Sequence, residues 1–515
     1  MPLGLAPARR AGILPRMRRS LALVLGGTAL VAACRPATAP GGGGGGPGTH
    51  TGYYVTVGGS ASGAGTDASP WDISTALNGG NGNIQPGDTV WIRGGTYLGP
   101  FTSTLTGSVS APITVRAYPG ERAIIDGKNT PNNGSEILTV DGAYTNFWGL
   151  EITNTVTQRT DTRHSGVYLR NAQHVKLINL IIHDTGMGVF GEPDARFCEV
   201  YGSIIYNGGW QTATRSNGHA LYMKGDATGA KVIKDNVMFN MFGLGFHGYA
   251  DAGTGPIDNI TLQGNVIFNS GTLSDIYTSS NILVGGEDAA DNITIQNNYT
   301  YFSPGKGAYN VRLGYLSTAN GSINFTGNYL VGAPTVLETR FWNTATVSGN
   351  TISGTGTLVD FRDASTGYTW TNNNFYRDST ASAWRFGGTA YSLPNWRTQA
   401  GLGSGDHALA DPTTTVTVVR PNTYEPGRAN IIVYNWGNLA NALVNVAGVL
   451  NSGDHYQVFN VQALFGSPVV SGTYNGGGTI SVPMGGVAPP APIGGSTGTP
   501  VQTGPAFDVF LLLKQ

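Results

Sequence analysis

One short phrase returns nine times between Gly149 and Asp378, and it limits the fold more than any other feature of the chain. The copies are GLEITN from Gly149, NLIIHD from Asn179, GSIIYN from Gly202, NVMFNM from Asn236, NVIFNS from Asn265, NYTYFS from Asn298, NYLVGA from Asn328, NTISGT from Asn350 and NFYRDS from Asn374. Neighbouring copies start between 22 residues apart (328 to 350) and 34 residues apart (202 to 236). Short apolar alternation broken by Gly and Asn is typical of strands. A unit of this size cannot bury its own apolar face, so we predict that the copies stack into a parallel β-solenoid.

The recurring Asn or Gly has a physical role at the turn between two strands of one coil. A sharp turn needs a residue that tolerates a left-handed backbone, and Gly and Asn adopt it at the lowest cost. Stacked Asn side chains can also hydrogen-bond to one another along the axis of the solenoid. We therefore expect turns and an amide ladder at this position.

The repeats resemble those of the right-handed parallel β-helix proteins of the pectate-lyase-like superfamily, over roughly residues 53 to 384. The opening motif PGDTVWIRGGTY, with ITVRAYPGE behind it, is similar to the first coils of many such extracellular proteins. The resemblance implies the fold but leaves the activity open, because that superfamily holds lyases, hydrolases, epimerases and adhesins. The R-x-P-x-x-R motif of the classical pectate lyases is not present, and the hydrolase motifs NTD, DD and GHG do not occur in order. No catalytic residue is therefore carried over from the resemblance.

The N-terminus has the pattern of a secretory signal. MRRS from Met17 is a basic segment, LALVLGGTALVA is an apolar segment too short to span a bilayer, and VAAC ends at Cys34. VAAC resembles the lipobox of bacterial lipoproteins, which implies that Cys34 is lipidated. We expect a protein anchored by lipid in the bacterial cell envelope, at the outer membrane if the cell is Gram-negative, on its periplasmic or outer surface.

The composition divides the chain into four segments. Residues 1–34 form the signal with the lipidated cysteine, and residues 35–52 form a tether that contains six consecutive glycines. We predict the right-handed parallel β-helix over residues 53–401, with a short capping helix at Asp72 to Leu77. The segment 412–515 alternates without the Asn phrase and predicts a small antiparallel β-sandwich, similar to accessory domains of carbohydrate-active enzymes. Cys198 then has no partner and is expected to be a buried thiol.

Charge argues against nucleic acid as a partner. The chain has 29 basic and 30 acidic residues, and five of the arginines lie before position 34, so 24 basic residues face 30 acidic ones in the remainder, a net charge of −6. A basic surface is expected of nucleic-acid-binding proteins, and this chain is acidic. We expect a polysaccharide partner and a monomer.

Side chains that point outward from stacked strands form columns, and two such columns hold the candidate site. We align the strand after each phrase by its inward apolar pairs. The first predicted outward column is Tyr168, Gly188, Tyr222, Gly245, Leu283, Arg312, Glu338 and Asp360. The second is Arg170, Phe190, Lys224, His247, Gly285, Gly314, Arg340 and Arg362. In this register Gly245, Gly285 and Gly314 leave gaps that would form a groove.

The middle of these columns provides candidate catalytic residues. Lys224 and His247 are predicted to lie on adjacent coils, with Tyr222 beside them, Tyr249 just beyond and His219 ahead of the same strand. A His or a desolvated Lys can act as a base near neutral pH, and a Tyr can return a proton. The alternative is that these are surface residues with hydrogen-bond partners.

Further along the columns, the candidate substrate-binding residues are Arg312, Arg340, Glu338 and Trp342. Arginine binds carboxylates, and Trp342 could stack on a sugar ring or cover the solenoid. A salt-bridge lattice between neighbouring coils explains the same charges.

Acidic residues in the loops leave two further possibilities open. Glu287 and Asp288 offer oxygen ligands for Ca²⁺, which is a possible cofactor and not a certain one. Together with Asp226 and Asp251 they could instead supply the two carboxyl groups of an inverting glycoside hydrolase.

The sequence favours a polysaccharide lyase that acts on a uronic-acid polymer by β-elimination. Such an enzyme neutralises the carboxylate, removes the C5 proton and expels the sugar linked at C4. A glycoside hydrolase on the same scaffold and a non-catalytic glycan-binding or structural solenoid are the alternatives.

Overall fold

The computed structural model describes residues 52–130, 136–160, 162–213, 216–276, 280–363, 366–494 and 498–515. Cys34 and the tether lie outside these residues. None of the described helices is both long enough and apolar enough to cross a bilayer.

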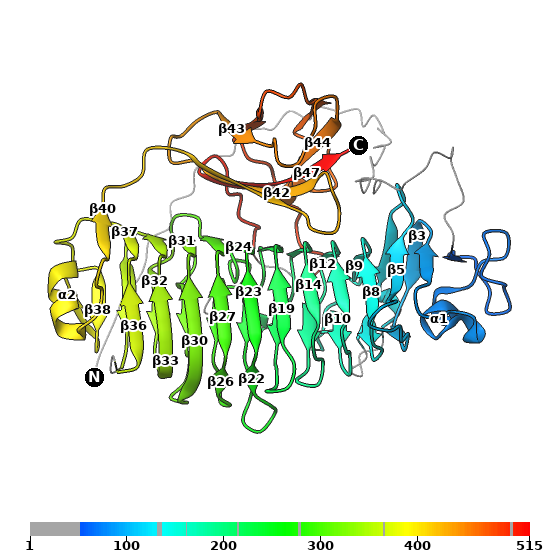
Figure 1. Ribbon diagram of the computed structural model, residues 1–515, viewed down its shortest axis with the longest axis horizontal. Coiled ribbons are helices and arrows are strands. Elements are labelled where there is room, and N and C mark those ends of the chain that lie inside the picture. Colours follow the sequence, from blue (N-terminus) through cyan, green and yellow to red (C-terminus); the bar gives the residue numbers. More distant parts are fainter. Residues whose placement is uncertain are drawn as a thin grey trace, which may run out of the picture.

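The chain winds into a right-handed parallel β-helix whose strands form three parallel walls (Figure 1). Within the described residues each wall is a sheet of 12 strands. The first sheet contains β1 (Tyr53–Val55), β2 (Thr89–Ile92), β5 (Ile113–Ala117), β8 (Thr145–Trp148), β11 (Lys176–Ile178), β14 (Glu199–Tyr201), β19 (Lys231–Lys234), β23 (Ile260–Gln263), β27 (Ile293–Gln296), β30 (Asn320–Thr326), β33 (Trp342–Ser348) and β36 (Tyr368–Thr371).

From β2 onward, each coil passes from the first sheet to the third and then to the second. The second contains β4 (Phe101–Ser103), β7 (Leu138–Val140), β10 (Ser165–Leu169), β13 (Met187–Gly191), β18 (Leu221–Met223), β21 (Phe246–Gly248), β25 (Ile282–Val284), β29 (Tyr309–Leu313), β32 (Thr335–Thr339), β35 (Thr357–Phe361), β38 (Trp384–Phe386) and the antiparallel β39 (Thr389–Tyr391). The third contains β3 (Gly95–Leu98), β6 (Ala123–Asp126), β9 (Glu151–Thr153), β12 (Ile181–His183), β15 (Ile204–Tyr206), β20 (Val237–Phe239), β24 (Val266–Phe268), β28 (Tyr299–Tyr301), β31 (Tyr329–Val331), β34 (Thr351–Ser353), β37 (Asn374–Tyr376) and β40 (His407–Leu409).

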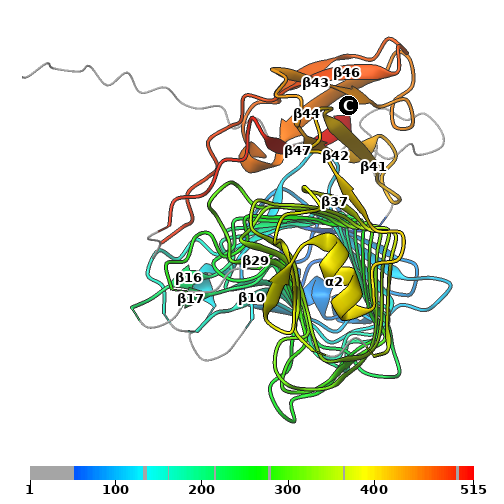
Figure 2. The same cartoon turned by 90° about the vertical axis from the view of Figure 1, so that its left-hand side faces the viewer.

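Short elements decorate the coils and cover their two ends. They are α1 (Ile73–Leu77), η1 (Gly80–Gly82), η2 (Gly127–Asn129), the β16 (Trp210–Gln211) and β17 (Ser216–Asn217) hairpin, β22 (Ile257–Asp258), β26 (Ala290–Asp291) and α2 (Leu393–Ala400). The helix α1 begins where the sequence predicts it, because the side chain of Asp72 caps it by accepting a hydrogen bond from the Thr75 N–H at 2.8 Å. The helix α2 lies across the other open end (Figure 2) and buries Trp396 completely, which the strand pattern did not predict.

The two roles expected of the repeated Asn or Gly belong to two neighbouring rows. The residues with a left-handed backbone are Gly149, Asn179, Gly202, Asp235, Gly264, Asn297, Gly327, Gly349 and Asn372. The next row forms the asparagine ladder, which consists of Asn236, Asn265, Asn298, Asn328, Asn350 and Asn373. Each ladder Nδ2 donates to the Oδ1 of the next coil at 2.9–3.0 Å. The first three phrases therefore start one residue before the ladder row, at Gly149, Asn179 and Gly202, and the ninth starts one residue after it, since Asn373 and not Asn374 occupies the ladder.

The C-terminal domain is the predicted antiparallel sandwich. One sheet has the order β41 (Val416–Pro421), β42 (Arg428–Tyr434), β47 (Phe507–Lys514), β44 (His455–Asn460) and β45 (Val470–Thr473), and β43 (Asn441–Asn445) pairs with β46 (Thr479–Pro483). The turn η3 (Val461–Ala463) follows β44. Val444, Val482 and Phe510 are among the fully buried residues of the core that joins the two sheets.

This domain sits on the outer face of the third sheet (Figure 1). Phe239 and Phe268 of the solenoid form one buried cluster with Tyr434 and Phe507 of the domain. Polar bonds reinforce the contact, for example from Arg420 to Asp235 at 2.8 Å. The C-terminal domain therefore covers the third sheet from β12 to β31, and this part of the sheet is not an open binding face. The strands that carry the predicted columns belong to the second sheet.

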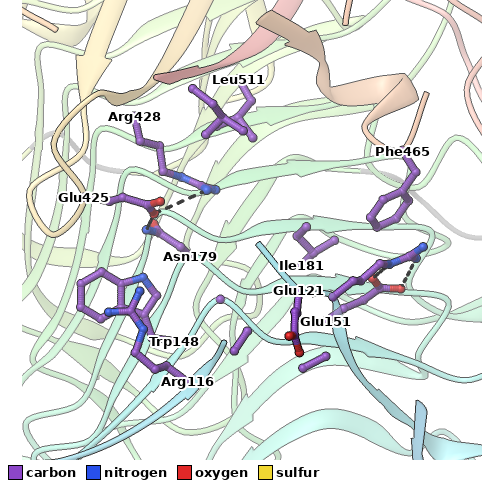
Figure 3. Close-up of a pocket in the computed structure, with 15 residues that line it drawn as sticks. Arg116, Glu121, Trp148, Glu151, Asn179, Ile181, Glu425, Arg428, Phe465 and Leu511 are labelled. Atoms are coloured by element: carbon purple, nitrogen blue, oxygen red, sulfur yellow. Dashed lines mark hydrogen bonds and ion pairs between the residues drawn. The ribbon is translucent and has the colours of Figure 1, made fainter. Parts of the chain in front are cut away.

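Polar and charged groups also line the seam between the two domains (Figure 3). Glu425 of the C-terminal domain lies 3.7 Å from Arg428 and accepts a hydrogen bond from Asn179 at 2.8 Å. The guanidinium of Arg122, which is bound to Glu151, lies 3.9 Å from the centre of the Phe465 ring. The enclosed space there is only about 50 Å³, so this seam holds the domains together and is too small for a sugar.

Candidate functional site

The pairing of the second sheet brings nine side chains into one outward row. The row, which we call the outward row, is Tyr168, Phe190, Tyr222, His247, Leu283, Arg312, Glu338, Asp360 and Arg385. Its first four members carry rings and its last four carry charges, with Leu283 between them. Adjacent coils lie about 4.8 Å apart. A polymer lying along the axis could therefore contact several members at once.

This row corrects the sequence register in two coils. Phe190 and His247 belong to the outward row, where the sequence placed Gly188 and Gly245. The cause is a glycine at an inward position in each coil, Gly191 and Gly248, which does not read as apolar. A Cβ at Gly191 would lie 2.7 Å from the Met223 sulfur, because the methionine fills that space.

The rings of the outward row pack against one another, the first pair stacked and the next two pairs tilted. The ring centres of Tyr168 and Phe190 are 5.2 Å apart, those of Phe190 and Tyr222 are 5.0 Å apart, and those of Tyr222 and His247 are 4.8 Å apart. Such offset contacts stabilise the row and hold each ring in a fixed orientation. Tyr222 and His247 therefore lie side by side, as direct strand partners.

His247 lies among aromatic and imidazole rings. Its ring centre is 4.4 Å from that of His219 and 4.9 Å from that of Tyr249. Burial, with a smaller effect from His219, lowers the pKa of His247 well below its usual range. The residue is only 9% exposed, and its Nδ1 is buried and has no hydrogen-bond partner among the described residues. A neutral imidazole at pH 7 can accept a proton.

His219 has a structural bond that limits its chemistry. Its Nδ1 accepts the Leu244 N–H at 2.9 Å, so the ring proton sits on Nε2 in the neutral form. Protonation of Nδ1 would break that bond. We therefore assign His219 to the support of His247 and not to proton transfer.

Lys224 occupies the position after β18, one row from Tyr222. Its Nζ donates to the Thr254 carbonyl at 3.3 Å and lies 3.9 Å from a Glu192 carboxylate oxygen. Glu192 in turn accepts the Tyr168 hydroxyl at 2.9 Å. The sequence analysis missed Glu192, whose place beside Lys224 follows only from the corrected register.

Tyr249 continues the row of Lys224 on the next coil. Burial, together with the nearby charges of Asp251 and Glu287, raises the pKa of Tyr249 to about 12. The phenol therefore keeps its proton at neutral pH.

Glu136 is another group that the sequence analysis missed. Burial raises the pKa of Glu136 to about 7, although its hydrogen bonds to Ser165 oppose the shift.

The predicted glycine groove is absent from the described part of this face. A Cβ at Gly245 would lie 2.2 Å from Ile267, and one at Gly314 would lie 2.0 Å from the Arg340 carbonyl. These glycines allow close packing and leave no gap. The face is instead flanked by the β16–β17 hairpin, seen beside β10 in Figure 2, and by the loop at 249–256 that receives Lys224.

The charged half of the row is an arginine lattice built on buried acids. Glu338, which is 1% exposed, accepts Arg312 Nη2 at 2.9 Å and lies within 3.6 Å of Arg340 and Arg362. Asp360 lies 2.7 Å from Arg362. Glu338 thus positions the arginines and cannot itself meet a substrate.

Arg312 is held further by tyrosines. Its guanidinium lies 4.2 Å from the Tyr309 ring centre and 4.7 Å from the Tyr315 ring centre. Counting Arg312, Arg340, Arg362 and Arg385 against Glu338 and Asp360 gives a net charge of +2. The lattice therefore favours an anionic ligand.

Trp342 does not belong to this face. It begins β33 in the first sheet, is 3% exposed and packs in the core of the solenoid. Its expected role in stacking on a sugar is therefore wrong, because the side chain points inward.

The loop carboxylates are already engaged by the protein. Glu287 accepts the Ala252 N–H at 2.9 Å, and Asp288 accepts the N–H groups of Gly253 at 3.0 Å and Gly255 at 3.1 Å. No group of three or more His, Cys, Asp or Glu side chains suited to a metal occurs among the described residues. This donor set does not fit Ca²⁺, and no step below uses it.

Asp226 is engaged in the same way. Burial favours its neutral form, but hydrogen bonds from Arg196 and Thr228 dominate and lower the pKa of Asp226 to about 2. Asp251 is exposed on the loop.

Cys198 is a free buried thiol, as expected, and burial raises its pKa to about 11.

Comparison with known families agrees with the winding of the chain. The model of the Pel9A-like, right handed beta helix region matches residues 53–329, more than half of the 515 residues. The chain belongs to the Pel9A-like right-handed β-helix family. Within that family the fold is that of the polysaccharide-lyase-like β-helix proteins, and the second sheet is its candidate site.

Individual relatives match this Pel9A-like protein over different shares of its length. Pectate lyase PEL9 of Emericella nidulans is 32% identical over 157 residues, which are 27% of this chain and 35% of that protein. The crystal structure of pectate lyase Pel9A is 18% identical, with a TM-score of 0.43 over 60% of this chain and 78% of that one. A rhamnogalacturonan lyase is 18% identical, with a TM-score of 0.45 over 65% of this chain and 84% of that one.

Proposed function

We propose that this Pel9A-like protein is a polysaccharide lyase that cleaves a uronic-acid-containing polymer by β-elimination. The observation that supports it is the cluster of Tyr222, His247, Tyr249 and Lys224 on the outer side of the second sheet, followed by the arginine lattice. Family membership and the pectate lyase relative point in the same direction. The alternatives are a glycoside hydrolase and a non-catalytic glycan-binding or structural solenoid.

Each residue has a role in the proposed reaction. The Lys224 ammonium offsets the charge of the substrate carboxylate, and neutral His247 removes the C5 proton. The electron pair of the C–H bond forms the C4–C5 double bond as the C4–O bond breaks. The leaving oxygen takes a proton from Tyr249, whose pKa near 12 keeps it protonated until then.

The arginines bind the polymer beyond the reacting sugar. Arg312 and Arg340 can each pair with a uronate carboxylate, because both are fixed by Glu338 and only partly exposed. Glu338 neutralises part of their charge and sets their direction.

One assay separates the three functions. Wild-type protein is incubated with polygalacturonate, alginate and glycosaminoglycans, with and without calcium, while ultraviolet absorbance of unsaturated uronate and new reducing ends are followed. We expect unsaturated product. Reducing ends alone would identify a hydrolase, and binding without either product would identify a glycan-binding module.

Variants then test the assigned residues. We expect His247→Asn to lower kcat by about 100-fold or more and Tyr249→Phe to lower it by about 10-fold or more. His407→Asn on β40 of the third sheet and Tyr118→Phe just after β5 of the first sheet are the matched controls. Activity that survives the combined loss of Lys224 and His247 would show that the site is misplaced.

We further propose that the protein is anchored in the bacterial envelope by lipid on Cys34. The support is the sequence VAAC and the glycine tether. Metabolic labelling with a fatty acid, compared between wild type and Cys34→Ser, tests it, and equal labelling of the two would refute it.

A further inference from the structure

A cleft of about 680 Å³ separates the C-terminal domain from one corner of the solenoid. One wall consists of the turns that lead from the third sheet to the second in three successive coils, at residues 302–306, 332–334 and 353–356. The facing wall consists of residues 434–436 and Ala506 of the C-terminal domain. This volume is in the range of sites that hold small ligands, and domain boundaries often contain them.

The cleft is elongated. Arg377 and Asp411, which line it, also line a neighbouring hollow of about 610 Å³ that continues along residues 378–379 and 408–410. Two neighbouring hollows that share these residues suit a chain-like ligand better than a compact one.

The cleft combines an aromatic ring with fixed cations. Trp436 is half-buried, and its Nε1 donates to the Tyr329 hydroxyl at 3.0 Å, which fixes the ring. Arg377 donates to the carbonyls of Gly354 at 3.2 Å and Thr355 at 2.6 Å.

Lys306 adds a second cation at the rim of the cleft. It is exposed, and no ion pair of its ammonium occurs among the described residues. Lys306 and Arg377 against Asp411 give the lining a net charge of +1. Aromatic surface beside cations favours a sugar that carries carboxylates.

The cleft adjoins the arginine lattice through the chain itself. The turn at 302–306 leads into β29, which carries Arg312, and the turns at 332–334 and 353–356 lead into the strands of Glu338 and Asp360. We infer that the cleft is a second, non-catalytic site that binds a short uronate oligosaccharide around the corner from the second sheet. This inference rests on the substrate class of the proposed function but not on its chemistry.

Calorimetry with the full chain tests the inference. The His247→Asn variant, which should not cleave its ligand, is titrated with trigalacturonate and with neutral maltotriose. Thr355→Trp fills the cleft from an exposed position, and Lys306→Glu reverses one charge at its rim. Thr479→Trp on β46 and Lys128→Glu on the first coils are the matched controls.

We expect two equivalents of trigalacturonate to bind, and one of them to weaken by at least about tenfold in Thr355→Trp and in Lys306→Glu. The controls should bind as before, and maltotriose should bind at least about tenfold more weakly. A single equivalent that neither cleft variant changes, or equal binding of the neutral sugar, would overturn the inference. Cleavage by Thr355→Trp should match wild type. If no polymer is cleaved but binding remains sensitive to Thr355→Trp, the second site stands and the lyase proposal falls.

Discussion

Replacement of Asn298 by Ala should destabilise the solenoid strongly, because this side chain takes part in five hydrogen bonds, four of them buried. Its Oδ1 accepts from the N–H of Asn265 at 3.0 Å and from the Nδ2 of Asn265 at 2.9 Å. Its Nδ2 donates to the carbonyls of Leu262 and Gln296, each at 3.1 Å, and to Asn328 Oδ1 at 3.0 Å.

The expected size follows from what Ala leaves behind. The buried N–H of Asn265 loses its acceptor, which costs about 1 to 3 kcal/mol, and the other bonds contribute about 1 kcal/mol each when their partners retain other contacts. Because the amide has only two N–H protons, its three donated bonds count as two, so together with the two accepted bonds we expect a loss of about 4 to 6 kcal/mol in the free energy of unfolding.

Guanidinium unfolding followed by tryptophan fluorescence measures this loss. Asn324→Ala is the matched control, since Asn324 is exposed on β30 of the next coil and should change the stability by less than about 0.5 kcal/mol. Equal unfolding midpoints for the two variants would refute the view that the ladder stabilises the coils.

Three further predictions concern the site and the domain seam. The kcat/KM of the lyase should stay constant with respect to ionisation of the base above pH 6.5 and fall only at lower pH, because the pKa of His247 is lowered well below 6.5. A fall in kcat/KM centred above pH 7 would contradict His247 as the base. Glu338→Leu should cost about 3 kcal/mol in unfolding free energy and weaken polymer binding, since it leaves Arg312 without its buried partner. Glu287→Leu in an exposed loop should cost less, and calorimetric unfolding of the two variants compares the losses. At His183, burial opposes the charge, but bonds to Asp184 and Glu151 dominate and raise its pKa to about 9; its stabilising effect should therefore be complete below pH 6.5 and disappear as the pH rises to about 9, and a His183→Asn variant with the same pH dependence of unfolding as wild type would disprove this.

The sequence was sufficient for the solenoid because its signal is local and repeated. Each coil carries its own turn residue, its own ladder residue and its own alternating strands, so one error does not propagate. The capping turn at Asp72 and the C-terminal sandwich were also predictable from local patterns.

The details of the site were less predictable, because a glycine can occupy a core position without an apolar signal. Gly191 and Gly248 face inward in place of the Leu or Met of other coils, so an alignment on apolar residues slips by two positions. The slip moved His247 away from Tyr222 and concealed Glu192. The prediction for Trp342 was wrong for a related reason. The sequence pattern alone could not show on which side of β33 the ring lies.

The asparagine ladder also has a direction, which determines how it can end. Every carboxamide in the ladder donates a hydrogen bond to the next coil toward the C-terminal end, so the residue that ends the ladder must accept without donating. Asp406 does this, since its Oδ1 accepts both the backbone N–H and the Nδ2 of Asn373 and its Oδ2 accepts the Trp370 indole. An aspartate is thus a terminator in this series, and whole coils bearing Asn could be inserted or deleted upstream while the same last residue closes the stack.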